Sequence, residues 1–218
     1  MMKGLLIKDL KIMANQKRFF FILLFVVVIG LLFGDPSFEI TFAIVMLGVF
    51  TTNTINYDTY NNGEAFLFTL PISRKGYVRE KYMFLILVTV CSSVIIGGLS
   101  VAAMNMRQME YSAGMVASLA ASAFMATTVM AALVIPIRLK YGTERSQTII
   151  FIIIGAIAVI VCMTLPMSLL NMADLESVFE KILGNSIIMV VGALAVIDVA
   201  ILVSSYILSV RIMEKKEL

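Results

Sequence analysis

The sequence predicts an all-helical integral membrane protein with six transmembrane helices. Hydrophobic residues make up 61% of the 218-residue chain and charged residues only 14%, whereas soluble domains carry about 45–50% and about 25%. The apolar residues also gather in long runs, and about 20 such residues form a helix that crosses a bilayer. Inside lipid a helix satisfies its own backbone hydrogen bonds, so we expect each run to be helical.

Six apolar runs are long enough to serve as spans, and they take up most of the chain. We place them at Phe19–Gly34, Phe38–Tyr57, Tyr82–Met104, Ser112–Ile137, Thr148–Leu169 and Asn185–Val210. The first run is short, about 24 Å at about 1.5 Å per residue, and a preceding helix can extend it at its start. Residues 1–218 are therefore expected to form a single transmembrane domain with no room for a soluble enzyme domain.

Basic residues gather in every second gap between these runs. Fifteen of the 17 lysines and arginines lie in residues 1–18, 58–81, 138–147 and 211–218. Because positively charged loops stay on the cytoplasmic side, both termini are predicted to be cytoplasmic. The alternate gaps contain Arg107 and Lys181 together with the acidic residues Asp35, Glu39, Glu110, Asp174, Glu176 and Glu180.

Residues 1–18 are predicted to form an amphipathic helix. At about 100° per residue, one stripe is polar and the opposing stripe is apolar. The polar stripe contains Lys8, Lys11, Asn15 and Arg18, and the apolar stripe contains Leu6, Leu10 and Met13, flanked by Ile7 and Ala14. Such a helix suits the membrane interface, as an elbow leading into the first span. The alternative is a basic flank that only sets the topology.

The cytoplasmic segment from Asp58 to Lys81 is longer than two adjacent spans need, and it contains large apolar residues. Glu64–Leu70 is compatible with a helix that Pro71 ends, and Ser73 can cap the helix that enters the third span. The Phe66-Leu67-Phe68 cluster is costly to expose to water. Two alternatives remain open: a cytoplasmic partner covers the cluster, or it folds back onto the chain's own spans.

Polar residues within the predicted spans are candidates for a transport pathway. Asp198 lies in the middle of the sixth span, where an ionisable group costs at least about 2.5 kcal/mol and faces the bundle interior or water. Asn53 and Asn56 lie near the cytoplasmic end of the second span. Each of these residues either lines a pathway or makes a hydrogen bond between helices, and the second reading is favoured for the asparagines.

Several function classes are disfavoured by what the sequence lacks. The chain has no histidine, which excludes histidine general bases and histidine metal sites, and it contains no P-loop motif for ATP phosphates. A net charge of +3 is too small to suggest a nucleic-acid partner. We therefore expect no catalytic residues, no metal site and no cofactor in this chain.

Three cytoplasmic elements contain short motifs. The first is Lys8-Asp9-Leu10 near the start of the chain. The second runs from Glu64 through Leu70-Pro71-Ile72-Ser73-Arg74-Lys75 to Tyr77-Val78 and Lys81-Tyr82. The third is Lys140-Tyr141-Gly142-Thr143-Glu144-Arg145, where Gly142 is predicted to turn the chain. Together, these elements resemble those of ABC-2-type transporter permeases, the six-span membrane subunits of ATP-driven bacterial exporters. Gly76 departs from the glutamate common there, which would complete a capping box with Ser73. Size and motifs are also similar to the permease subunits of phenol-soluble-modulin exporters.

The resemblance implies that Glu64–Leu70 is a coupling helix that docks on a separate ATPase subunit. Apolar side chains would supply buried contact, and Glu64, Arg74 and Lys75 would orient the docking by charge. The implied docking residues are Glu64, Phe66, Leu67, Phe68, Leu70, Pro71, Ser73, Arg74, Lys75 and Tyr77, and the second cytoplasmic loop contributes Lys140, Tyr141, Gly142, Glu144 and Arg145.

The resemblance also implies the partners and the location of the chain. Two copies of the ATPase, which carry the ATP and magnesium, would drive a pathway formed by two permease subunits, identical or homologous, in the bacterial plasma membrane. A hydrophobic or amphipathic peptide, lipid or drug is the expected cargo. The rival readings are a non-transporting scaffold, immunity or sensor protein, and an ATP-independent carrier.

Overall fold

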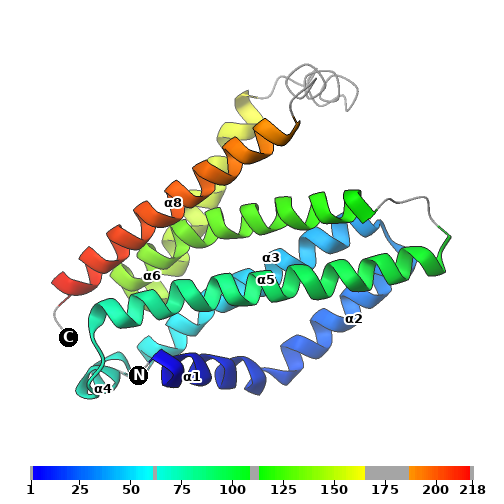
Figure 1. Ribbon diagram of the computed structural model, residues 1–218. Coiled ribbons are helices and arrows are strands. Elements are labelled where there is room, and N and C mark those ends of the chain that lie inside the picture. Colours follow the sequence, from blue (N-terminus) through cyan, green and yellow to red (C-terminus); the bar gives the residue numbers. More distant parts are fainter. Residues whose placement is uncertain (1, 61–62, 109–112, 165–186, 217–218) are drawn as a thin grey trace.

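The computed structural model describes residues 2–60, 63–108, 113–164 and 187–216, and the regular structure in these ranges is helical (Figure 1). The start of α1 and the end of α8 lie at the same end of the helix bundle (Figure 1). The helices are α1 (Met2–Asn15), α2 (Lys17–Phe33), α3 (Pro36–Thr59), α4 (Gly63–Thr69), α5 (Arg74–Met106), α6 (Ala113–Thr164) and α8 (Ile187–Lys215).

The predicted N-terminal helix is present as α1. A bend of 68° at Gln16 separates α1 from α2. The buried residues of α1 are Leu5, Asp9 and Met13, whereas Leu10 is 49% exposed. Two members of the predicted apolar stripe, Leu10 and Met13, thus differ in burial. The side of α1 that packs on the protein also includes a charged residue, Asp9, which hydrophobic periodicity does not detect.

The starts of α3 and α5 are fixed by caps that the residue types explain. The side chain of Asp35 accepts a hydrogen bond from the Ser37 backbone nitrogen at 2.9 Å, and Pro36 occupies the first turn of α3. At α5, the Ser73 hydroxyl accepts from the Gly76 backbone nitrogen at 3.1 Å. The predicted cap at Ser73 is therefore confirmed, even though Gly76 has no side chain with which to complete a capping box.

The number of spans differs from the prediction of six. Four helices of the described chain are long and apolar enough to cross a membrane, or up to five if the bent α1–α2 pair is one span. Two predicted spans, Ser112–Ile137 and Thr148–Leu169, fall largely on α6, which is interrupted only at Gly142 (φ 71°, ψ −171°). The count of six is thus not confirmed.

Part of the predicted outer side cannot be compared. Residues 109–112 and 165–186 lie outside the described residues. They include the end of the fifth predicted span, the start of the sixth, Lys181 and the acidic residues Glu110, Asp174, Glu176 and Glu180.

Among the described residues, three hydrophobic clusters form the core. A small one between α1, α3 and α5 consists of Met13, Phe50, Phe84 and Val88. The two larger clusters lie one at each end of the bundle. One cluster joins α2, α3, α5 and α6, and the other joins α1, α3, α4, α5, α6 and α8. Between α3 and α6, a side chain at Gly48 would collide with the methyl group of Thr127, so glycine permits this close approach. The second cluster lies at the end where α3 finishes and α5 begins, and it positions the residues described next.

Candidate functional site

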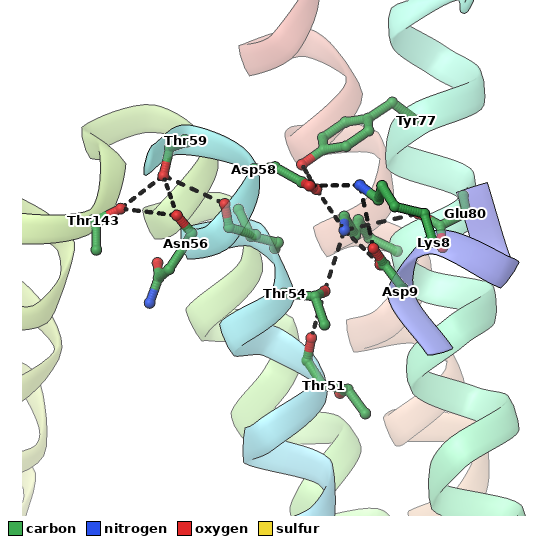
Figure 2. Close-up of polar contacts among 12 residues, drawn as sticks. Lys8, Asp9, Thr51, Thr54, Asn56, Asp58, Thr59, Tyr77, Glu80 and Thr143 are labelled. Carbon is green, nitrogen blue, oxygen red and sulfur yellow. Dashed lines mark hydrogen bonds and ion pairs between the residues drawn. The ribbon is translucent and has the colours of Figure 1, made fainter. Parts of the chain in front are cut away.

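A buried cluster of charged residues joins α1, the end of α3 and the start of α5 (Figure 2). Its centre is the ammonium group of Lys81. This nitrogen lies 2.5 Å from Asp9 Oδ2 and 2.7 Å from Asp58 Oδ2, and it donates a hydrogen bond to Thr54 Oγ1 at 3.1 Å. We call Lys8, Asp9, Asp58, Tyr77, Glu80 and Lys81 the charged cluster.

A second cation and a tyrosine complete the charged cluster. Lys8 Nζ lies 2.5 Å from Asp58 Oδ1 and 3.2 Å from Asp9 Oδ1, so each aspartate bridges both lysines. The Tyr77 hydroxyl donates to Asp58 Oδ2 at 2.9 Å, and the Lys81 ammonium lies 5.2 Å from the centre of the Tyr77 ring. The three helices are therefore held together by a network and not by one pair (Figure 2).

Most of the charged cluster is removed from solvent, whereas the Lys8 side chain is 29% exposed. Asp9 and Glu80 are 0% exposed and Lys81 is 3% exposed. Burial costs several kcal/mol per ion, which is offset only by close pairing and hydrogen bonding. Glu80 has the weakest pairing, since its Oε2 lies 3.9 Å from Lys81 Nζ. Such a network stabilises one arrangement of the three helices, because moving any one helix away leaves a buried charge without its partner.

The charged cluster was not predicted from the sequence as a unit. Tyr77 was expected to contact a partner, and Lys8 was placed on an outward polar stripe, but both point into the protein. One local signal did exist. Asp9 is the sole acidic residue among the first 18, in a helix with several basic residues. An isolated carboxylate of this kind indicates a pairing partner elsewhere in the chain.

The short helix α4 coincides with the predicted coupling helix and presents two different faces. Phe66 is 71% exposed and Leu70, just after the helix, is 47% exposed. Leu67 is buried in the core, and the Phe68 ring packs edge-on against Tyr77 with centroids 5.7 Å apart. The second alternative, folding back onto the chain's own helices, therefore holds for Leu67 and Phe68. One face of α4 folds onto the protein, whereas Phe66 and Leu70 remain uncovered.

The end of α8 holds α4 and the start of α5. Lys216 Nζ lies 2.7 Å from Glu64 Oε2, and Arg74 Nη1 donates to the carbonyl oxygens of Met213 and Glu214 at 3.2 and 2.8 Å. Arg74 thereby satisfies carbonyls that the end of a helix leaves unpaired. Glu64 and Arg74 were expected to orient a partner by charge, but in this structure both bind the protein's own C-terminal segment.

The remaining predicted docking residues are exposed. Lys75 forms an ion pair with Glu214 at 3.2 Å, in which the two side chains are 68% and 46% exposed. A pair this open to solvent contributes little stability. Pro71 and Ser73 are exposed between α4 and α5. Together with Phe66 and Leu70, they form the part of the predicted surface that a partner can reach.

The predicted second loop lies at the same end of the bundle. Gly142 makes its turn, and the Thr143 hydroxyl is 2.7 Å from the Thr59 hydroxyl at the end of α3 (Figure 2). The Lys140 ammonium lies 5.0 Å from the centre of the Tyr141 ring. The exposed residues of this loop are Lys140, Tyr141, Glu144 and Arg145.

The three candidate pathway residues all lie against neighbouring helices. Asn53 Oδ1 accepts a hydrogen bond from Arg138 Nη1 at 2.7 Å, and Asn53 and Asn56 both line a pocket of about 340 Å³ with Thr143. Both carboxylate oxygens of Asp198 accept from the Thr128 hydroxyl, at 2.9 and 2.8 Å. Asn53 and Asp198 thus make the interhelical bonds that the structural alternative requires, whereas Asn56 Oδ1 has no hydrogen-bond partner among the described residues.

A further interhelical network was not expected from the sequence. The Tyr82 hydroxyl lies 2.6 Å from the Ser205 hydroxyl and 2.9 Å from the Ser209 hydroxyl. Ser205 also donates to the Ala132 carbonyl at 2.5 Å. This network joins α5, α6 and α8, and Tyr82 directly follows Lys81 of the charged cluster. Both sets of contacts therefore connect helices at the end of the bundle that carries α4.

Comparison with known proteins assigns the chain to a family. The chain matches the family model described as ABC-2 family transporter protein over residues 4–214. Neither a curated protein nor a solved structure matches it. The matched region contains α4, the charged cluster and the Gly142 turn, and the helices around them are apolar and long enough to cross a membrane. The chain therefore belongs to the ABC-2 family of transporters and is a membrane-embedded permease.

Proposed function

We propose that this permease is the membrane subunit of an ATP-binding-cassette exporter and that α4 is its coupling helix. The observation that carries this proposal is the divided character of α4. Its inner face is fixed by Leu67 and by the Glu64–Lys216 pair, while Phe66 stands 71% exposed on the other face. A large apolar side chain held out on a rigidly anchored helix suits docking into a groove on a separate ATPase subunit.

A push on α4 has a direct route into the spans. Phe68 contacts Tyr77, whose hydroxyl binds Asp58, and Asp58 is paired with lysines of α1 and α5. Glu64 transmits force in another direction, because its ion pair with Lys216 leads to the end of α8. ATP binding and hydrolysis on the partner, where the nucleotide and magnesium reside, would move these helices together.

The orientation follows from charge. Lys8, Arg74, Arg138 and Lys216 all lie at the end of the bundle that carries α4. By the positive-inside rule we place this end, with both termini, in the cytoplasm of a bacterium. The 52 residues of α6 measure about 78 Å at about 1.5 Å per residue, more than twice the bilayer core, so we count the parts before and after Gly142 as two spans. With α2, α3, α5 and α8 this gives six spans.

The remaining parts of the proposal concern assembly and cargo. Two permease subunits, identical or homologous, form the pathway, and two ATPase copies bind from the cytoplasm. A hydrophobic or amphipathic cargo, such as a peptide, lipid or drug, suits the apolar spans. The similarity to phenol-soluble-modulin exporters favours amphipathic peptides within this class.

Co-purification with an ATP-binding-cassette ATPase subunit from the same organism tests the docking proposal. We expect Phe66→Asp to abolish the association, because a carboxylate would enter an apolar interface, and Phe66→Leu to preserve most of it. Wild-type expression and thermal stability of both variants would show that α4 is intact. The proposal is wrong if Phe66→Asp and Leu70→Asp both leave ATPase association unchanged.

A further inference from the structure

An apolar groove runs between α2, α3 and α5, on the part of the bundle away from α4. Its volume is about 430 Å³, and its lining side chains are apolar. The lining includes residues that the protein itself leaves open, such as Leu24, Val28, Leu32, Leu99, Ala102 and Met106. A cavity with this lining does not hold water, so something apolar must fill it in a membrane.

The groove is as long as one leaflet of a bilayer. Along α2 its lining extends from Phe20 to Leu32, about 18 Å at about 1.5 Å per residue. Along α5 it extends from Ile95 to Met106, which is about 16 Å. Half of a hydrocarbon core of about 30 Å is about 15 Å, so one acyl chain lying along the groove would reach from the headgroup level to the midplane.

A fixed guanidinium group stands at the outer end of this groove. Arg107 follows the lining residue Met106, and its Nη1 donates to the carbonyls of Leu31 and Gly34 at 3.0 and 2.9 Å. These bonds use one of the three guanidinium nitrogens and hold the group against the end of α2. Asp35 and Glu39 lie on the neighbouring turn and first turn of α3, but within the described ranges neither forms an ion pair with Arg107.

We propose that this groove binds one phospholipid of the membrane, with an acyl chain between α2 and α5 and the headgroup phosphate at Arg107. Arginine matches phosphate geometry through parallel N–H donors, and the apolar lining supplies the surface that an acyl chain requires. The site is distinct from α4 and from the charged cluster. Its existence does not depend on the proposed ATPase docking, and neither result decides the other.

Native mass spectrometry of the full chain, purified in a mild detergent and mixed with a defined phosphatidylglycerol, tests the proposal. We expect one lipid to remain bound and Arg107→Gln to weaken its retention about tenfold, as removal of a charged hydrogen bond predicts. Ala102→Phe would fill the groove and remove the bound lipid. The matched control is Ala200→Phe on α8, which is also exposed but lines no part of the groove and should retain the lipid.

Tryptophan fluorescence gives an independent measurement, because the chain contains no tryptophan. In detergent, a brominated phospholipid should quench Leu99→Trp in the groove at lower lipid concentration than Val196→Trp on the exposed face of α8. Equal quenching curves would show bulk lipid only and would overturn the proposal. So would a specific dimer cross-linked through Leu24→Cys, in a chain with Cys91 and Cys162 replaced, because a second copy would then occupy the groove.

Discussion

The two ends of α5 bury very different chemistry. At its start, Tyr77, Glu80 and Lys81 are buried and charged or polar. Tyr77 binds α3, and Lys81 binds both α1 and α3. At its other end, Ile95 to Met106 line an apolar groove that opens to the surroundings. The comparison shows that this permease concentrates its buried polar interactions at the end that carries α4. These interactions fix the arrangement of the helices there.

The contrast follows from the different free-energy cost of moving helices apart at each end of α5. A buried network of charges stabilises one geometry strongly, because every displacement leaves an ion without its partner. Apolar contacts with lipid have no such preference, since lipid chains are as apolar as the side chains that they touch. Substitutions at the two ends should therefore differ in size, and the predictions below run from the largest expected effect to the smallest.

Replacing Lys81 should have the largest effect on stability. Lys81→Met leaves Asp9 and Asp58 with Lys8 as their remaining cation and should lower the free energy of unfolding by about 3–5 kcal/mol. Thermal unfolding in detergent measures this change. Lys75→Met is the matched control, because its ion pair is exposed to solvent and its loss should be nearly neutral. Equal losses in the two variants would contradict the role of burial.

The Glu64–Lys216 pair should have the next largest effect. Glu64→Gln removes an ion pair at 2.7 Å with a largely buried carboxylate, and we expect a loss of about 1.5–3 kcal/mol. A double-mutant cycle with Lys216→Gln isolates the pair, and the exchanged pair Glu64→Lys with Lys216→Glu should recover part of the loss. A coupling energy of zero would mean that the end of α8 does not hold α4.

The Asp198–Thr128 contact should have a smaller effect. Thr128→Val removes the hydroxyl that both Asp198 oxygens accept from, at a cost of about 0.6–2 kcal/mol for an interhelical bond. Transport by Asp198→Asn separates the two readings of this residue, because asparagine can keep the hydrogen bond without the charge. Normal transport by Asp198→Asn supports a structural role, and lost transport by a stable variant supports a pathway role.

The apolar end of α5 should be the most tolerant. Leu99 is 48% exposed, so Leu99→Ala should change the free energy of unfolding by no more than about 0.5 kcal/mol. Phe84→Ala is the comparison within the same helix. Phe84 is 1% exposed, so its truncation leaves a cavity and should lower the free energy of unfolding by about 3–5 kcal/mol. A large loss at Leu99 would mean that another part of the protein covers the groove, which would remove the contrast between the two ends.

Several elements were predictable because their signals are local. Pro71 follows α4 and Ser73 caps α5, as the sequence predicts. The cap at Asp35 and Pro36 is equally local, but the predicted span began at Phe38 and did not include it. Gly142 was correctly expected to turn the chain, since its positive φ suits glycine. Helix position and helix ends depend on residues within a few positions of one another, and a single sequence contains that information.

The site depended on contacts between distant residues and was predicted only in part. Asp9 and Lys81 are separated by 72 residues, and Glu64 and Lys216 by 152. Apart from the isolated carboxylate of Asp9, the local pattern does not distinguish a charge that faces water from one that pairs across the bundle. Glu64 and Arg74 illustrate this point, because their charges would serve equally well in a partner interface or in the internal contacts that the structure shows. Their role in docking stays a prediction.

The sequence by itself determined that this chain is helical and membrane-embedded, and it located the helix that carries Phe66, because hydropathy and caps act over a few residues. The tertiary structure alone decided which side of α4 is covered and which charges meet beneath it. That choice follows from how α3, α5 and the end of α8 pack against α4. A buried charge is favourable only where an oppositely charged group from another helix lies within bonding distance.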